Sequence, residues 1–162
     1  MGGKNIKEYT LPNLMSHIAM VFQNVYLFED TIENNIKFGV PSATREEVIE
    51  AAKKAMCHDF IEALPNGYDT LIGEGGATLS GGQKQRISIA RAMLKDAPIV
   101  IFDEATANID LENEDKLKAA IEELTKNKTI IMIAHRLSTI RNADQILVLN
   151  NGKIEQRGNH AV

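Results

Sequence analysis

Cysteine and tryptophan are scarce in this sequence of 162 residues, which contains one cysteine and no tryptophan. The single cysteine, Cys57, excludes an internal disulfide framework and is typical of a reducing compartment. No cysteine and histidine residues have the spacing of a zinc site. No apolar run is long enough to span a membrane, and residues 1–10 lack the apolar core of a signal peptide. These absences predict a soluble, cytoplasmic chain that reaches a membrane only through a partner.

An excess of positive charge is also missing. The 18 lysine and arginine residues are outnumbered by 22 aspartate and glutamate residues, so the formal net charge is −4 at pH 7. A surface that binds nucleic acid should be basic, and we therefore expect no nucleic-acid partner. Hydrophobic residues make up 44% of the chain and charged residues 25%, which is an ordinary globular composition, and the length favours one domain.

Patterns of apolar residues and turn signals predict the order of elements along the chain. They predict a strand over 17–23, a helix over 44–57 capped by Thr44 with Glu47, a short helix ended by Pro65 and Gly67, a helix from 80 to about 94, a strand over 98–106, a helix over 113–127, a strand over 128–135 and a hairpin over 144–158. The strands over 98–106 and 128–135 are unbroken apolar runs, which is typical of strands buried on both faces. Asn151 and Gly152 are the expected hairpin turn. Buried strands that alternate with helices favour an α/β fold with a mainly parallel sheet, to which the hairpin adds an antiparallel end.

The motif LSGGQ (79–83) opens a run that otherwise reads as a strong helix. Ser80 and Gln83 have the spacing of a capping box, which predicts a helix start at Ser80. Free backbone N–H groups and the positive end of the helix dipole lie at such a start. Gly81 and Gly82 would leave these groups bare, so that a phosphate could sit directly on them. Alone, the two glycines favour a plain capped helix with a flexible entry.

Two carboxylates end the strand expected over 98–106. Asp103 and Glu104 should lie at the carboxyl edge of the sheet, where ligands bind in open α/β folds. Asp103 is suited to hold Mg²⁺ directly or through water, and Glu104 is suited to accept a proton from an attacking water. Adjacent acids could also be solvated strand ends, but the strand is too apolar for us to prefer that interpretation. The next strand ends in the same way at His135, for which we favour a polar role at the same edge over a structural one.

Five motifs, in order and with compatible spacing, resemble those of the nucleotide-binding domain of ABC transporters, specifically of the exporter type. The matching segments are VFQNVYLFEDTIENNIKFG for the Q-loop region, LSGGQKQRISIARAML for the signature and its helix, IVIFDEAT for Walker B, ANID for the D-loop and IAHRLSTI for the switch region. The resemblance covers nearly the whole chain. It implies a P-loop NTPase type of α/β fold with an inserted helical subdomain over about 24–95, with 1–23 and 96–162 as the rest of the catalytic core.

The resemblance also implies the cofactors ATP and Mg²⁺ and a role for each matching residue. In the family two such domains meet head to tail and enclose ATP between them. By position, the signature residues would contact the γ-phosphate of ATP held by the opposite domain; they are Ser80, Gly81, Gly82 and Gln83. Asp103 would organise Mg²⁺, Gln23 would sense Mg²⁺ and water, and Glu104 would be the general base. His135 would contact the γ-phosphate, and Asp110 would bridge the two domains.

One family motif, the P-loop, does not occur in the sequence. The P-loop requires G-x-x-x-x-G-K-[ST], and the only Gly-Lys pair near the start, Gly3-Lys4, is followed by Asn5. We interpret this stretch as a turn, and we expect Pro12 to limit any helix after it. By comparison with the family, the chain would be the C-terminal two-thirds of the domain, truncated so that the P-loop strand and helix are missing.

The leading hypothesis is therefore the ATPase motor of an exporter at the cytoplasmic face of the membrane. Its partners would be the transmembrane domain of the transporter and a second nucleotide-binding domain. Two alternatives stay open: an ABC-type ATPase of a non-transport class, and a non-catalytic chain that presents only the signature face to a partner. We expect the isolated chain to bind ATP weakly, not to hydrolyse it, and to self-associate through apolar surface and an open sheet edge.

Overall fold

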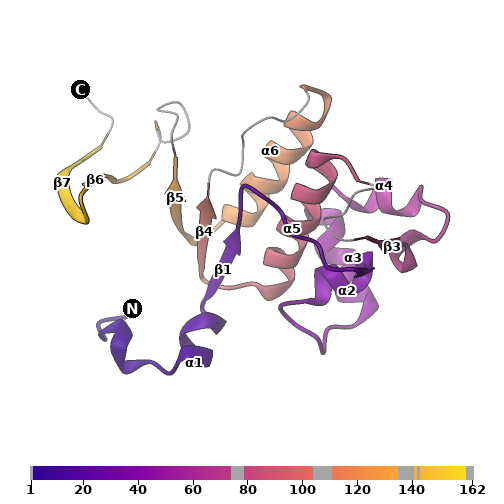
Figure 1. Ribbon diagram of the computed structural model, residues 1–162, viewed down its shortest axis with the longest axis horizontal. Helices are drawn as coiled ribbons and strands as arrows, with labels where there is room; N and C mark the ends of the chain where they lie inside the picture. The colour runs from indigo at the N-terminus through magenta and orange to yellow at the C-terminus, as the bar shows by residue number, and fades with distance from the viewer. Residues whose placement is uncertain (1, 74–78, 104–110, 135–140, 142, 160–162) are drawn as a thin grey trace.

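The computed structural model describes residues 2–73, 79–103, 111–134, 141 and 143–159, and Figure 1 shows how its elements are arranged. The helices are η1 (Ile6–Glu8), α1 (Leu11–Ser16), α2 (Ile32–Lys37), α3 (Arg45–Lys54), α4 (His58–Glu62), η2 (Gly67–Asp69), α5 (Gly81–Lys95) and α6 (Leu111–Thr125). The strands are β1 (Ile18–Val21), β2 (Asp30–Thr31), β3 (Leu71–Ile72), β4 (Ile99–Asp103), β5 (Thr129–Ile133), β6 (Ile146–Asn150) and β7 (Lys153–Gly158). The fold is mixed α/β, as predicted.

Three parallel strands form the central sheet in the order β1-β4-β5. Val21 pairs with Phe102, and Phe102 pairs with Met132, so the three strands run in register toward one carboxyl edge. The last pair at that edge joins Asp103 to Ile133. The prediction of a parallel sheet is therefore confirmed, and the predicted strand over 17–23 is shorter than expected because β1 ends at Val21.

Helices α5 and α6 lie side by side and cover one face of this sheet (Figure 1). Val100 and Phe102 point into that interface and are buried. On the opposite face, by contrast, the exposed fractions are 44% for Met20 and 50% each for Ile131 and Ile133. The prediction that the strands over 98–106 and 128–135 are buried on both faces is wrong for the described residues. An apolar sequence fits both faces, but the described helices cover only one.

Helix α5 is the centre of the molecule, because it contacts β1 and the helices α2, α3 and α6. Its buried residues join those of the sheet and of the other helices in one hydrophobic core. The largest fully buried side chains of that core are Tyr68, Phe102, Leu27, Ile32, Ile36, Ile61, Ile72, Ile87, Ile89, Leu117, Leu124 and Val21. The segment between β1 and α5 is therefore held mainly by its packing against α5.

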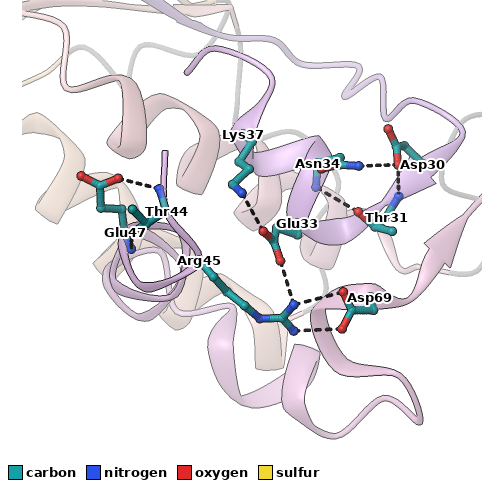
Figure 2. A network of polar contacts seen from close by, with 9 residues as sticks. All are labelled: Asp30, Thr31, Glu33, Asn34, Lys37, Thr44, Arg45, Glu47 and Asp69. Atoms are coloured by element: carbon teal, nitrogen blue, oxygen red, sulfur yellow. Dashed lines mark hydrogen bonds and ion pairs between the residues drawn. The ribbon is translucent and has the colours of Figure 1, made fainter. Parts of the chain in front are cut away.

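A polar network on the surface joins α2, α3 and η2 (Figure 2). The Arg45 guanidinium lies 3.0 Å from a Glu33 carboxylate oxygen and donates to both carboxylate oxygens of Asp69, at 3.1 and 3.0 Å. Hydrogen bonds from Arg45 hold the pKa of Asp69 below its usual value. Lys37 approaches Glu33 from the other side at 2.7 Å. Because these groups are solvent-exposed to differing degrees, the network fixes geometry more than it adds stability.

The helix ends follow local sequence rules. Thr44 and Glu47 form the predicted capping box at the start of α3. Helix α5 ends at Lys95, and its C-cap residue Asp96 takes the left-handed conformation with φ 46°. Lys128 approaches the Asp96 carboxylate at 2.8 Å. Only the three-residue η1 follows the turn at Gly3-Lys4, and no helix of the described residues runs from that turn through Pro12. Pro12 itself lies in the first turn of α1, where a missing N–H costs nothing.

The C-terminal hairpin of β6 and β7 forms the predicted antiparallel pair, with φ 48° at Asn151 and φ 74° at Gly152 in its turn. It does not extend the central sheet, however, because the two strands form a two-stranded sheet of their own. The prediction that the hairpin adds an antiparallel end to the parallel sheet is thus wrong within the described part of the chain. No helix among the described residues has both the length and the apolar character needed to cross a membrane.

Candidate functional site

The start of α5 has the local geometry that its sequence predicts. The Gln83 N–H donates to Ser80 Oγ at 3.2 Å, and the Ser80 N–H donates to Gln83 Oε1 at 2.9 Å, which completes a reciprocal capping box. The Lys84 N–H donates to the Ser80 carbonyl at 3.0 Å. The N–H groups of Gly81, Gly82 and Gln83 precede the first bond of the helical ladder, and the capping box uses only that of Gln83. The helix start and its capping box are confirmed.

The two glycines of the motif differ in their surroundings. Ser80 and Gly81 are exposed, whereas Gly82 is buried. A Cβ built on Gly81 would meet no atom within 4 Å, so the space above this residue is open to a ligand or to a second chain. The exposed start of a 15-residue helix carries partial positive charge, which favours an anion at that place.

A second group of predicted residues lies at the carboxyl edge of the sheet. Asp103 is the last residue of β4 and is half-buried, and Gln23 follows the end of β1 and is exposed. The register of β1 with β4 brings both to the same edge, and β5 ends there at Ile133. Three further predicted residues, Glu104, Asp110 and His135, lie outside the described residues.

Carboxylate and amide oxygens at one sheet edge are the kind of donors that Mg²⁺ prefers. Asp103 and Gln23 supply one of each, so the described residues fit such an ion in donor type. Among the described residues there is no group of three or more histidine, cysteine, aspartate or glutamate side chains that could hold a metal by themselves. The described residues at this edge therefore supply only part of the donor set that such an ion needs.

Two residues of α5, Gln85 and Arg91, hold the segment that carries Gln23. The sequence patterns did not indicate either of them. Gln85 is buried, and its side-chain N–H donates to the Phe22 carbonyl at 3.4 Å. Arg91 donates to the Tyr26 carbonyl at 3.5 Å. These contacts span 63 and 65 residues of sequence, so no local pattern could have indicated them.

Two other features lie away from this edge. A groove of about 660 Å³ is lined by residues of α3 and of the C-terminal ends of α5 and α6, among them Asp96 and Lys128 at the amino end of the sheet. Cys57 is buried, and burial raises the pKa of its thiol to about 12. A thiol with so high a pKa is neutral at physiological pH and is a packing residue rather than a nucleophile or metal ligand.

The sequence matches the profile of the ABC transporter family over residues 1–107. This match covers more than half of the chain, and the protein belongs to the ABC transporter family. The family prediction and the predicted α/β fold with a parallel sheet are thereby confirmed.

Relatives from several bacteria match almost the whole chain. The sequence is 53% identical over 162 residues to the ATP-dependent lipid A-core flippase of Vibrio cholerae, and 56% identical over 158 residues to that of Desulfotalea psychrophila. The matches cover 99% and 98% of this chain but 28% of each relative. The chain thus spans little more than a quarter of the length of these relatives.

A solved structure gives the same result for the fold. The chain superposes with a TM-score of 0.87 on the structure of a bacterial Atm1-family ABC exporter with ATP bound, at 45% sequence identity. The superposition covers 98% of this chain and 28% of that chain. Sequence and fold therefore agree on a nucleotide-binding domain of the exporter type.

Proposed function

We propose that this chain is the signature-bearing part of the motor domain of an ATP-driven exporter. The observation that carries the proposal is the exposed, capped start of α5, where Ser80 and Gly81 lie open at the positive end of a long helix. In a head-to-tail pair of domains this start would bind the γ-phosphate of ATP held by the second domain. Gly82 and Gln83 would complete the contact through the backbone and the side chain.

The carboxyl edge of the sheet would act on the other nucleotide of the pair, the one held by the domain to which this chain itself belongs. Asp103 and Gln23 would hold Mg²⁺, whose charge offsets the negative charge that phosphoryl transfer concentrates on the phosphate oxygens. Glu104 would take the proton of the attacking water as general base. His135 would contact the γ-phosphate, and Asp110 would bridge the two domains.

The whole transporter would include a transmembrane domain and would hold this domain at the cytoplasmic face of the membrane. The exporter names of the relatives support this arrangement, and they make lipid A-core the first cargo to test. The chain by itself would not hydrolyse ATP, because its sequence contains no P-loop to hold the β- and γ-phosphates. Helix-dipole and N–H contacts at one helix start contribute up to about 2 kcal/mol, less than the roughly 4 kcal/mol of millimolar binding.

The proposal is tested in the full-length transporter by Glu104→Gln, which keeps the shape of the side chain and removes the base. Bound ATP should be retained, and turnover should fall by about 10²–10⁴-fold, the usual contribution of general-base catalysis. Glu122→Gln, on the exposed surface of α6, is the matched control and should leave turnover unchanged. Normal turnover in Glu104→Gln would assign the base to another residue.

A calorimetric titration of the chain alone with Mg-ATP tests the second part. We expect a dissociation constant in the millimolar range or weaker. Micromolar binding would show that another segment of this chain performs the task of the P-loop, and the division of labour between two domains proposed here would be wrong.

A further inference from the structure

The loop between β1 and β2 is held by the buried side chain of Asn35, which makes two hydrogen bonds to the backbone of one residue, Phe28. Asn35 Oδ1 accepts a hydrogen bond from the Phe28 N–H at 2.8 Å, and Asn35 Nδ2 donates to the Phe28 carbonyl at 3.0 Å. Asn35 is buried, with 1% of its surface exposed. A buried amide that makes both bonds to one backbone unit fixes the position of that unit, because each bond would be costly to lose.

Arg91 of α5 holds this pair from the other side. Its Nε donates to the Asn35 carbonyl at 2.7 Å, and one of its terminal nitrogens lies 3.4 Å from Asn35 Oδ1. The guanidinium carbon also lies 5.8 and 5.5 Å from the ring centroids of Phe28 and Phe38, which stack on each other. Burial lowers the pKa of Arg91, but an arginine keeps its charge in proteins. The charge is offset by these carbonyls and ring faces.

The same helix holds the segment over 22–28 at both ends. Gln85 bonds to the Phe22 carbonyl, and Arg91 bonds to the Tyr26 carbonyl. In Figure 1 this segment leaves the top of β1 and crosses α5 on its way to α2. Gln23 lies inside the segment. Helix α5 thus connects the capped start at Ser80 to Phe22, the neighbour of Gln23.

We propose that Arg91 is a positioning residue that fixes the segment with Gln23 to α5, so that the start of α5 and Gln23 move together. The proposal rests on the proposed function, because only there do both places act on a nucleotide. Contact of a phosphate with Ser80 would then be transmitted along α5 to the edge of the sheet. Loss of the Arg91 guanidinium would weaken this coupling without touching either place, because Gln85 alone would then hold the segment to α5.

Amide hydrogen exchange measured by NMR on this chain tests the attachment. In Arg91→Met the Phe28 N–H should exchange at least tenfold faster, relative to the amides of β5 as a reference for global unfolding. Arg45→Met is the matched control, because the Arg45 guanidinium also lies over an aromatic ring. Its hydrogen bonds and ion pairs in the described structure go to Asp69 and Glu33 and not to the segment over 22–28. Arg45→Met should leave the exchange rate of the Phe28 N–H, relative to that of the β5 amides, unchanged.

Arg91→Lys guards against misfolding of the methionine variant. Lysine keeps the charge but lacks the planar set of donors, so the Phe28 amide should exchange at a rate between wild type and Arg91→Met. The attachment would be refuted if the Phe28 N–H of Arg91→Met exchanged as slowly as in wild type. It would also be refuted if its exchange rate rose only by the same factor as that of the β5 amides.

Kinetics in the full-length transporter test the role in catalysis. Arg91→Met should lower kcat for ATP hydrolysis about tenfold with little change in KM, because Arg91 contacts none of the proposed nucleotide-binding residues directly, and Arg91→Lys should restore part of kcat. Arg45→Met should keep kcat per folded molecule. An unchanged kcat in Arg91→Met would overturn the coupling. A wild-type transporter without ATPase activity would instead refute the proposed function, while the amide measurement would still decide the attachment.

Discussion

Replacing Ser80 by alanine tests the start of α5 without any nucleotide. The substitution removes Oγ, which accepts the Gln83 N–H at 3.2 Å, and leaves the return bond from the Ser80 N–H to the Gln83 side chain with less support. Loss of an N-cap side chain costs about 1 kcal/mol, within a range of roughly 0.5–2 kcal/mol.

The exposure of this site places the expected loss at the lower end of that range. Ser80 is exposed, so water can replace part of the lost hydrogen bond. We expect Ser80→Ala to lower the free energy of unfolding by about 0.5–1 kcal/mol. For a domain of this size that corresponds to a decrease in Tm of about 1–4 °C. The m-value should not change, because the core is untouched.

The assay is urea unfolding of the chain followed by circular dichroism. Thr44→Ala is the matched control, because Thr44 and Glu47 form the same reciprocal box at the start of α3 with bonds of 3.3 and 2.7 Å. Both alanine variants should lose similar stability, and Ser80→Asn, which keeps an N-cap acceptor, should recover most of the loss. Stability lost in Thr44→Ala but unchanged in Ser80→Ala would show that α5 does not begin with a side-chain cap.

The Cys57 thiol, whose pKa is raised to about 12 by burial, should not react with a thiol reagent at pH 8 until the chain unfolds. In the folded state this pKa is higher than the ordinary value of 9.0, so the protonated thiol favours folding. Its contribution to the free energy of unfolding is complete below pH 9 and should fall as the pH rises toward 12, which urea unfolding across this range would detect. Ile131→Lys, on the uncovered face of the sheet, should reduce self-association in analytical ultracentrifugation without unfolding the chain, whereas Met132→Lys on the covered face should destabilise it. Gly152→Val should destabilise the hairpin by about 1 kcal/mol or more because φ is 74°, while Gly158→Ala, with no positive φ and open space around it, should be nearly neutral by NMR of the β6–β7 amides.

Features set by a few neighbouring residues could be predicted from the sequence. The two capping boxes at Thr44 and Ser80 and the Asn151-Gly152 turn each depend on side chains within three or four positions. Helix α1 is also a local feature, but it was not predicted because the effect of its proline depends on where the helix begins. A proline inside a helix is destructive but in its first turn it is favourable, and the sequence around Pro12 does not by itself distinguish the two.

Features set by distant residues could not be predicted. An apolar strand such as β5 has the same sequence whether one or both of its faces are covered, so the exposure of Ile131 depends on which helices are present. The attachment of Phe28 to Asn35 and Arg91 joins three segments of the chain, and polar residues in that role look like ordinary surface residues in the sequence. Family motifs indicated Gln23 and Ser80 but not the side chains that connect them.

The order of strands in the central sheet has a consequence for the synthesis of the protein. Ile18 pairs with Ile99, about eighty residues further along the chain, and β5 is added only after that pair. Among the described strands, β1 therefore lacks its partner β4 while the ribosome makes the segment from α2 to α5. During that interval the helices can pack on α5 first, since their contacts are more local. The pairing of β1 with β4 is thus a late, long-range step of folding, and until it occurs the edge of β1 that faces β4 is open to chaperones and to pairing with another unfinished copy.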